Sequence, residues 1–138
     1  MARETPRKQS VRMDDYLASI AMLAQQNKVV RVTQISKTLE VKNPSVTSAL
    51  KKLSEKGLVE HEKYGQVELT DRGEEIARKS IRQRKAISRF FIQVLGVDRE
   101  TAEEDARKIR DVISPLSMEL LTKFEEVVLT AHREKLID

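Results

Sequence analysis

TQISKTLEVKNPSVTSALKKLSEKG, residues 33–57, is the stretch that decides the fold of this chain. Its pattern predicts two short helices joined by a tight turn. Thr33 is expected to be the N-cap of the first helix and Asn43 that of the second, because short polar side chains accept hydrogen bonds from the free N–H groups of a first turn. Pro44 then takes the first helical position, where its missing N–H costs nothing. Gly57 is expected to end the second helix.

The second of these helices has two different faces. Apolar side chains recur at helical spacing on one face, at Val46, Leu50 and Leu53. The other face carries short hydrogen-bonding groups followed by cations, namely Ser45, Thr47, Ser48, Lys51 and Lys52. Short polar groups near a helix start can reach base edges in the major groove of DNA, and lysines further along suit phosphates. Taken alone, the segment fits an ordinary amphipathic helix with a solvated polar face equally well.

The next stretch, LVEHEKYGQVELTDRG (residues 58–73), predicts a small hairpin followed by another helix. Two short apolar strands flank a turn at Gly65. Thr70 or Asp71 is expected to cap the next helix, with Glu74 as the capping-box partner of Asp71. A helix pair, a hairpin and a further helix in this order indicate a winged helix-turn-helix, and the order is far more specific than any one element.

This arrangement predicts double-stranded DNA as the partner. Lys63 and Gln66 flank the hairpin tip and are expected to contact phosphates or the minor groove, and Lys42 is expected to contact phosphate. The predicted DNA-binding residues are Lys42, Pro44, Ser45, Thr47, Ser48, Lys51, Lys52, Lys63 and Gln66.

Composition excludes several classes of protein. The 138 residues contain no Cys, which rules out disulfides, zinc fingers and thiol catalysis. Because the sequence also has no histidine-centred constellation and no glycine-rich phosphate loop, we predict that the chain is not an enzyme. It has no signal peptide and no apolar run long enough to cross a membrane, so we expect a cytoplasmic protein that does not bind membranes.

Charge is unevenly distributed along the chain. Residues 1–64 carry twelve Lys and Arg against seven Asp and Glu, and residues 65–96 carry seven against four. Residues 97–138 reverse the balance, with seven against eleven. The basic first part is therefore expected to face phosphate, and the acidic last part is not.

The remaining pattern predicts helices over 12–26, 71–94 and 99–113 and a last helix after Pro115, with 29–32 as an extended connector. Asp98 and Ser117 are the expected N-caps of the last two helices. The fold class is mainly α with a small β-hairpin. We expect a basic flexible arm over 1–11, a winged helix-turn-helix domain over 12–73, a long connecting helix over 74–96 and a helical dimerisation domain over 97–138.

Apolar side chains in the last third of the chain exceed what one short neighbouring helix can bury. They recur over 86–95, at Ala86, Ile87, Phe90, Phe91, Val94 and Leu95, and over 120–128, at Leu120, Leu121, Phe124, Val127 and Val128. We expect a second copy of the chain to complete this core, which predicts a homodimer. A two-fold dimer also places two recognition helices about one helical turn of DNA apart.

Four phrases carry a resemblance to a known family: DDYLASIAML, VTQISKTLEVKNPSVTSALKKLSEKGLVEHEKYGQVELTDRG, RKAISRFFIQVLGVD and DARKIRDVISPLSMELL. The chain resembles the metal-dependent repressors of the diphtheria toxin repressor and manganese transport regulator family, in the short form without an SH3-like domain. The phrase over 84–98 is the most specific for it. The resemblance implies a homodimeric transcriptional repressor in which a divalent metal, Mn or Fe, stiffens the joint between the DNA-binding and dimerisation regions.

The ligand positions that the resemblance implies are largely substituted. They are Asp15, Ala18, Arg84, Arg107, Arg110 and Asp111. Asp15 keeps one carboxylate, but arginine stands at three of the positions. A guanidinium is always protonated and has no lone pair to donate, so it cannot ligate a cation. We therefore predict that the family's metal cofactor has been lost. The alternative is that metal binding is retained through Asp and Glu side chains at other positions.

Three interpretations of the arginines stay open. They could form salt bridges with Asp15, Asp111 and with Glu103 or Glu104, and so replace the link that a metal makes between three helices in relatives. They could bind an anionic effector such as phosphate or a carboxylate metabolite, which bidentate guanidinium geometry suits. They could also be exposed side chains that have drifted into these positions without a role.

Two other functions fit parts of the pattern. A small-molecule or anion-responsive regulator of the multiple-antibiotic-resistance type is also a winged-helix dimer with a long connecting helix, but the phrase over 84–98 favours the first family. An adaptor that uses its winged helix for protein contacts would be supported by an acidic recognition helix, and Lys51 and Lys52 argue against that.

Overall fold

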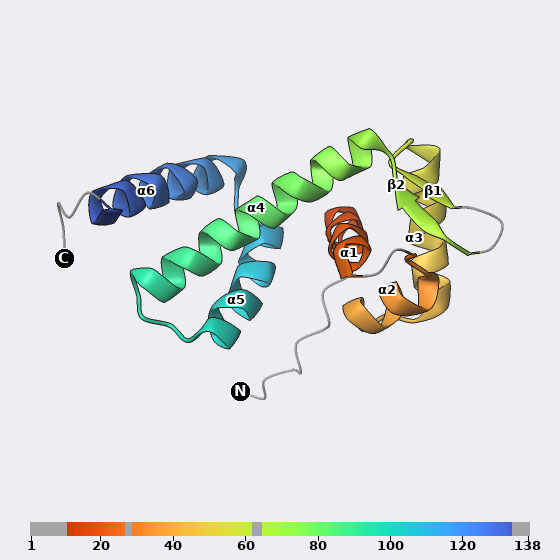
Figure 1. Ribbon diagram of the computed structural model, residues 1–138, viewed down its shortest axis with the longest axis horizontal. Helices are drawn as coiled ribbons and strands as arrows, with labels where there is room; N and C mark the ends of the chain where they lie inside the picture. Colours follow the sequence, from red (N-terminus) through yellow and green to blue (C-terminus); the bar gives the residue numbers. More distant parts are fainter. Residues whose placement is uncertain (1–10, 27–28, 62–64, 134–138) are drawn as a thin grey trace, which may run out of the picture. The chain divides into compact units, whose positions relative to one another are not determined.

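The computed structural model describes residues 11–26, 29–61 and 65–133, so most of the predicted basic arm and Lys63 lie outside the described residues (Figure 1). Its elements are α1 (Met13–Gln26), α2 (Val32–Leu39), α3 (Asn43–Glu55), β1 (Val59–His61), β2 (Val67–Leu69), α4 (Asp71–Gln93), α5 (Arg99–Val112) and α6 (Pro115–Arg133). The predicted fold class, mainly α with one antiparallel hairpin, is confirmed. The chain divides into two compact units, Met1–Ala77 and Arg78–Asp138, and α4 contributes to both. None of the described helices is both long and apolar enough to span a bilayer.

The first unit has a core built from one apolar side of each of its helices, including the predicted apolar face of α3. Almost completely buried are Leu17, Ile20, Ile35, Val46, Leu50 and Leu53. Val59 and Val67 add one side chain from each strand. Helical spacing aligns the apolar positions on one side, so packing that side removes them together from water. The C-terminal end of α1 departs from this pattern, since Ala24 is exposed.

Two helices of this unit begin earlier than predicted. Asn43 is the first residue of α3 and not its N-cap, because Lys42 is the last residue with extended backbone (φ −79°, ψ 150°) and its carbonyl already accepts helical hydrogen bonds. The N-cap of α2 is Arg31 and not Thr33, and the Gln34 side chain accepts a hydrogen bond from the Arg31 N–H at 2.9 Å. Each helix therefore begins where the extended backbone of the preceding segment ends. The preference of Thr33 and Asn43 for the N-cap position does not decide the start.

The end of α3 is confirmed at Gly57. This residue has φ +71°, and its N–H donates to the Ser54 carbonyl at 3.0 Å. The N–H of Leu58 donates to the Leu53 carbonyl at 2.9 Å, which completes a Schellman motif. The motif turns the chain directly into β1.

β1 and β2 form an antiparallel pair with Glu60 opposite Glu68. Among the described residues, a bridge between Arg31 and Gln66 joins the predicted extended connector to this hairpin, and the Val30 carbonyl accepts a hydrogen bond from the Val67 N–H at 2.8 Å. The wing is thus a two-stranded hairpin that is joined to the connector at Arg31 and Gln66.

Thr70 caps the start of α4. Its hydroxyl accepts a hydrogen bond from the Gly73 N–H at 3.1 Å and donates to the Gly57 carbonyl at 2.7 Å. The predicted capping box of Asp71 and Glu74 is wrong, because Asp71 is already the first helical residue.

α4 lies very close to the start of β1. A Cβ atom added to Gly73 would stand 2.0 Å from the carbonyl oxygen of Leu58. Only glycine permits this approach between a helix and a neighbouring backbone.

In the second unit, α4, α5 and α6 pack around a small core. The buried residues are Ala86, Ile87, Ala106 and Met118, and Phe91, Ile109, Ile113 and Leu121 pack against them. These side chains come from all three helices. Only part of the predicted apolar stretch over 86–95 is buried in this core. Val94 and Leu95 remain exposed.

The caps of α5 and α6 differ in how well they were predicted. Asp98 caps α5 as predicted by accepting a hydrogen bond from the Thr101 N–H at 3.0 Å, and this bond lowers the pKa of the Asp98 carboxyl. The predicted cap of α6 at Ser117 is wrong. Ser114 is the cap, since its hydroxyl accepts from the Ser117 N–H at 3.1 Å. Pro115 is thus the first residue of α6. Proline suits this position, where its missing N–H costs nothing.

An ion pair joins α4 to α6. Arg89 Nε lies 2.7 Å from Glu125 Oε1, and the Glu125 side chain is only 6% exposed, whereas that of Arg89 is 47% exposed. The two residues are 36 positions apart, and nothing in the sequence pattern pairs them. The pair holds the two helices in one packing arrangement.

Replacing Arg89 with methionine is expected to lower the free energy of unfolding by about 1–2 kcal/mol. The expected loss is smaller than for a fully buried ion pair, because solvent screens the partly exposed Arg89. The substitution keeps an apolar stem but leaves a buried carboxylate without its cation. Urea denaturation measures the change. The double variant Arg89→Met/Glu125→Leu should recover most of the loss, because it removes both charges. A single variant as stable as the parent would show that the pair contributes nothing.

Candidate nucleic-acid interface

The polar side of α3 is available for contact along its whole length. The exposed residues there include all seven predicted DNA contacts of this segment: Lys42, Pro44, Ser45, Thr47, Ser48, Lys51 and Lys52. The opposite side is held by Val46, Leu50 and Leu53, each with no exposed surface. This burial fixes the rotation of the helix, so the short polar groups of its first turns and the lysines that follow share one solvent-facing surface.

The wing contributes a second part of the candidate interface. Gln66 is half-buried at the bridge to Arg31, and Gly65 beside it has φ +75°. The Arg31 guanidinium lies next to Gly65, and Arg31 is an exposed residue. Arg31 is a cation beside the turn of the wing that sequence reasoning missed. Its position in the connector before α2 is the one signal that could have drawn attention to it.

The family metal positions in α1 are buried. Ala18 has no exposed surface and Asp15 is 4% exposed. Asp15 Oδ2 accepts a hydrogen bond from the Arg12 N–H at 3.2 Å, and Arg12 immediately precedes the helix. Asp15 therefore has a local structural role at the start of α1, where it satisfies one free backbone N–H group.

The family metal positions in the second unit are occupied by charged side chains that are partly buried. Arg84 of α4 and Arg110 and Asp111 of α5 are half-buried, and the Nε atoms of both arginines and Oδ1 of Asp111 have almost no exposed surface. None of these three side chains is without an interaction partner. Burying part of a charged side chain is costly unless it has partners.

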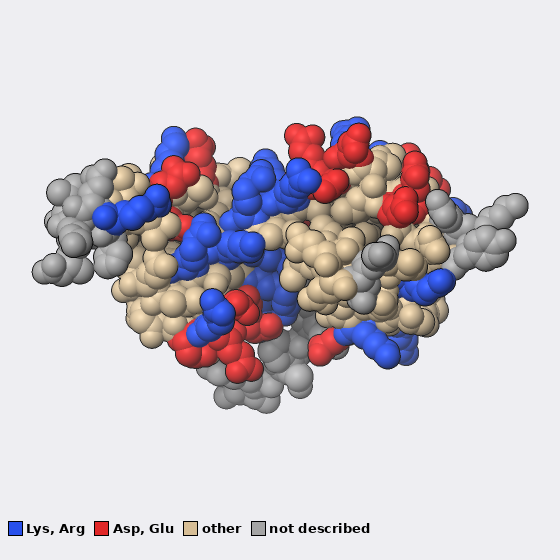
Figure 2. Space-filling view, viewed as in Figure 1, with Lys and Arg blue, Asp and Glu red and all other residues tan. Residues whose placement is uncertain are grey.

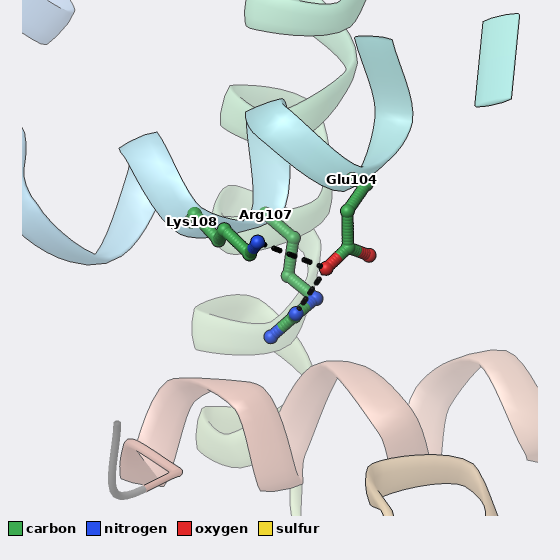
Figure 3. A network of polar contacts seen from close by, with 3 residues as sticks. All are labelled: Glu104, Arg107 and Lys108. Carbon is green, nitrogen blue, oxygen red and sulfur yellow. Dashed lines mark hydrogen bonds and ion pairs between the residues drawn. The ribbon is translucent and has the colours of Figure 1, made fainter. Parts of the chain in front are cut away.

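Arg107 differs from the other two arginines because it is exposed. Its Nη2 atom lies 2.7 Å from Glu104 Oε1, and Lys108 Nζ lies 3.6 Å from the same oxygen (Figure 3). The hydrogen bond from Arg107 is the main cause of a lowered pKa of the Glu104 carboxyl. Glu104, one of the predicted partners, thus pairs with Arg107 inside α5.

The residues present do not fit the divalent metal that the resemblance implies. Arg84, Arg107 and Arg110 offer no lone pair, and their charges repel a cation. Within the described ranges, His, Cys, Asp and Glu side chains form no group of three or more that could hold a metal ion. The donor chemistry of these positions therefore argues against a metal there.

A helix-turn-helix with an exposed polar second helix, followed by a hairpin wing, places the first unit among winged-helix DNA-binding domains. Two family models then match nearly the whole chain: the iron dependent repressor N-terminal DNA binding domain over residues 8–67, and the iron dependent repressor metal binding and dimerisation domain over residues 70–134. The chain belongs to this family of iron-dependent repressors. Its members are transcriptional regulators and not enzymes.

Individual relatives agree with this assignment. An uncharacterised HTH-type transcriptional regulator of Methanocaldococcus jannaschii is 35% identical over 83% of this chain and 92% of its own length. The HTH-type transcriptional regulator MntR of Bacillus subtilis is 30% identical, with 83% of this chain and 82% of the relative covered. The structure of the manganese regulator SloR is 28% identical with a TM-score of 0.70, over 81% of this chain and 52% of that one. The chain thus spans about half the length of that solved protein.

Proposed function

We propose that this chain is a sequence-specific repressor that binds double-stranded DNA as a homodimer and does not need the family's metal. The observation that carries the DNA-binding part is the exposed polar side of α3, fixed by a buried apolar side, inside a matched DNA-binding domain. We assign DNA binding to residues 12–73, the connection to 74–96 and dimerisation to 97–138. The family match favours this function over a regulator of the multiple-antibiotic-resistance type.

In the proposed complex, Ser45, Thr47 and Ser48 lie in the major groove, where their hydroxyls reach base edges or the nearby backbone. Lys51 and Lys52 follow along the helix and contact phosphates, as does Lys42 before it. Pro44 fixes the start of the helix, and the wing residues Lys63 and Gln66 contact the neighbouring backbone. Base readout by hydroxyls is permissive, so the operator must be found by experiment.

Exposed apolar side chains of the second unit support the homodimer. Seven of the eight large hydrophobic residues that are exposed in the described part of the chain belong to this unit: Val94, Leu95, Val112, Leu116, Leu120, Phe124 and Val127. Four of them, Leu116, Leu120, Phe124 and Val127, are spaced to form one stripe on α6. An apolar stripe of this kind marks a surface that a partner covers, and the matched domain is one of dimerisation.

Metal independence rests on the side chains at the ligand positions. Arg84, Arg110 and Asp111 are partly buried and engaged, which supports a network of charges in place of a metal. The pairing of these arginines with Asp15 joins residues of the two units and stays a prediction. An anionic effector on the same arginines is the alternative, since guanidinium groups bind phosphate and carboxylate well.

Selection of DNA from a random pool, repeated with EDTA, with Mn²⁺ and with Fe²⁺, tests this proposal. We expect the same operator in every condition and an affinity that EDTA does not change, because no arginine position needs a cation. A strong loss of binding with EDTA, restored only by manganese or iron, would contradict metal independence. A change in operator affinity on adding phosphate or citrate would favour the anionic effector over the charge network.

A further inference from the structure

The second unit carries a run of positive charge on α4. Residues 76–93 contain six cations and no Asp or Glu, namely Arg78, Lys79, Arg82, Arg84, Lys85 and Arg89. Four of them, Arg78, Arg82, Lys85 and Arg89, follow one another at spacings of four, three and four residues, which places them on one line along the helix. All four are exposed. This line, called here the α4 stripe, is separate from α3 and the wing.

The stripe lies on the side of α4 that faces away from the core of the second unit. Ser80 and Ile87, on the opposite side of the helix, are 1% and 0% exposed. Lys and Arg side chains gather over the middle of α4 in the space-filling view (Figure 2). The packing of the second unit thus fixes the rotation of the helix and points the cations outward.

Two members of the stripe have no counter-charge among the residues that the structure describes. Arg89 is held by Glu125 at 2.7 Å, and Arg78 also has an interaction partner. Arg82 and Lys85 form no ion pair with any residue in the described part of the chain. Elsewhere in this unit exposed cations sit beside carboxylates on the same helix, such as Arg99 with Glu103 and Lys123 with Glu119.

Like charges three and four residues apart destabilise a helix. The stripe is therefore an unfavourable pattern for α4 by itself, and an external anion would relieve it. Along its length of about 16 Å, one strand of B-DNA carries roughly five phosphates, and a guanidinium can bind a phosphate in bidentate fashion.

We propose that the α4 stripe is a second, sequence-independent contact surface for the phosphate backbone of double-stranded DNA. The choice of DNA as the polyanion rests on the proposed function. A membrane surface is disfavoured, because helices that lie on lipid insert their apolar side, and the apolar side of α4 is committed to the protein core at Ala86 and Ile87. In this arrangement α3 reads sequence, while the stripe adds affinity on any sequence.

The test compares two double variants of the whole chain on a long duplex of random sequence. Arg82→Gln/Lys85→Gln neutralises the stripe, and Arg99→Gln/Lys123→Gln removes the same charge from cations that already have carboxylate partners. We expect the first to reduce the slope of log Kobs against log salt by about 1.8 per protomer, at about 0.9 for each lost phosphate contact, and the second to leave it unchanged. Equal slopes for the two variants would overturn the proposal. Melting temperature and sedimentation confirm that both fold and assemble alike.

Two further comparisons distinguish this proposal from the proposed function and from binding to membranes. If operator selection succeeds but the two variants have equal slopes, the stripe is wrong and the proposed function stands. If selection returns no preferred sequence while the slope on random duplex still falls, the sequence-specific function is wrong and the stripe stands. Loss of binding to phosphatidylserine vesicles without a change on duplex DNA would assign the stripe to membranes and overturn the choice of DNA.

Discussion

Replacing Gly73 with alanine is expected to lower the free energy of unfolding by about 3 kcal/mol, near the upper end of the cost of overpacking. The added Cβ would stand 2.0 Å from the Leu58 carbonyl oxygen, which belongs to the backbone and cannot rotate away. α4 must then shift from the hairpin, and that shift breaks the hydrogen bonds that Thr70 makes to Gly73 and to Gly57. Urea denaturation followed by circular dichroism measures the loss.

Gly57→Ala is the matched control for this prediction. Gly57 has φ +71°, but a Cβ there would meet nothing within 4 Å. Its cost is the left-handed backbone alone, about 1 kcal/mol. If both variants lose the same stability, close approach at Gly73 has no energetic weight and glycine is needed there for another reason.

Lys51→Glu together with Lys52→Glu is expected to weaken binding to the selected operator by at least about 100-fold, because each reversed charge both loses a phosphate contact and repels the backbone. Both lysines are exposed on the last turns of α3, so the substitutions leave the buried side of the helix untouched. Fluorescence anisotropy with labelled duplex, at several salt concentrations, measures the affinity.

The variant Arg99→Glu/Lys123→Glu controls for net charge, since it also lowers the formal charge of +4 to zero. It should bind the operator nearly as well as the parent. Equal losses in the two variants would mean that overall charge, and not the position of the lysines on α3, drives binding. A full-strength complex with Lys51→Glu/Lys52→Glu would remove α3 from the interface.

Several features of this structure could be predicted from residue type and spacing alone. The spacing of Val46, Leu50 and Leu53 set the two sides of α3, and the same spacing of exposed and buried residues is found in the fold. Gly57 and Asp98 were predicted as helix ends because a left-handed C′ residue and an N-cap carboxylate act within a few residues. The arginines at the family's ligand positions also needed no coordinates, since a guanidinium lacks a lone pair whatever surrounds it.

Helix starts were predicted less well. Thr33, Asn43 and Ser117 are good capping residues, yet Arg31, Lys42 and Ser114 hold the cap positions. A cap preference contributes about 1 kcal/mol, and the path of the preceding chain outweighs it. The connector through Val30 is fixed by its hydrogen bond with Val67, and that bond decides where α2 can begin.

The sequence by itself determined which side of α3 is apolar, that α3 ends at Gly57, that Asp98 caps α5, and that three of the ligand positions hold arginine, which cannot ligate a metal. These properties depend on residue type and spacing over a single turn or two. Only the tertiary structure decided that Gly73 must pass beside Leu58, that Arg31 lies beside the turn of the wing, and that Arg89 holds Glu125 from 36 positions away. Contacts between distant segments depend on how whole helices pack, because the packing sets distances that no local pattern contains.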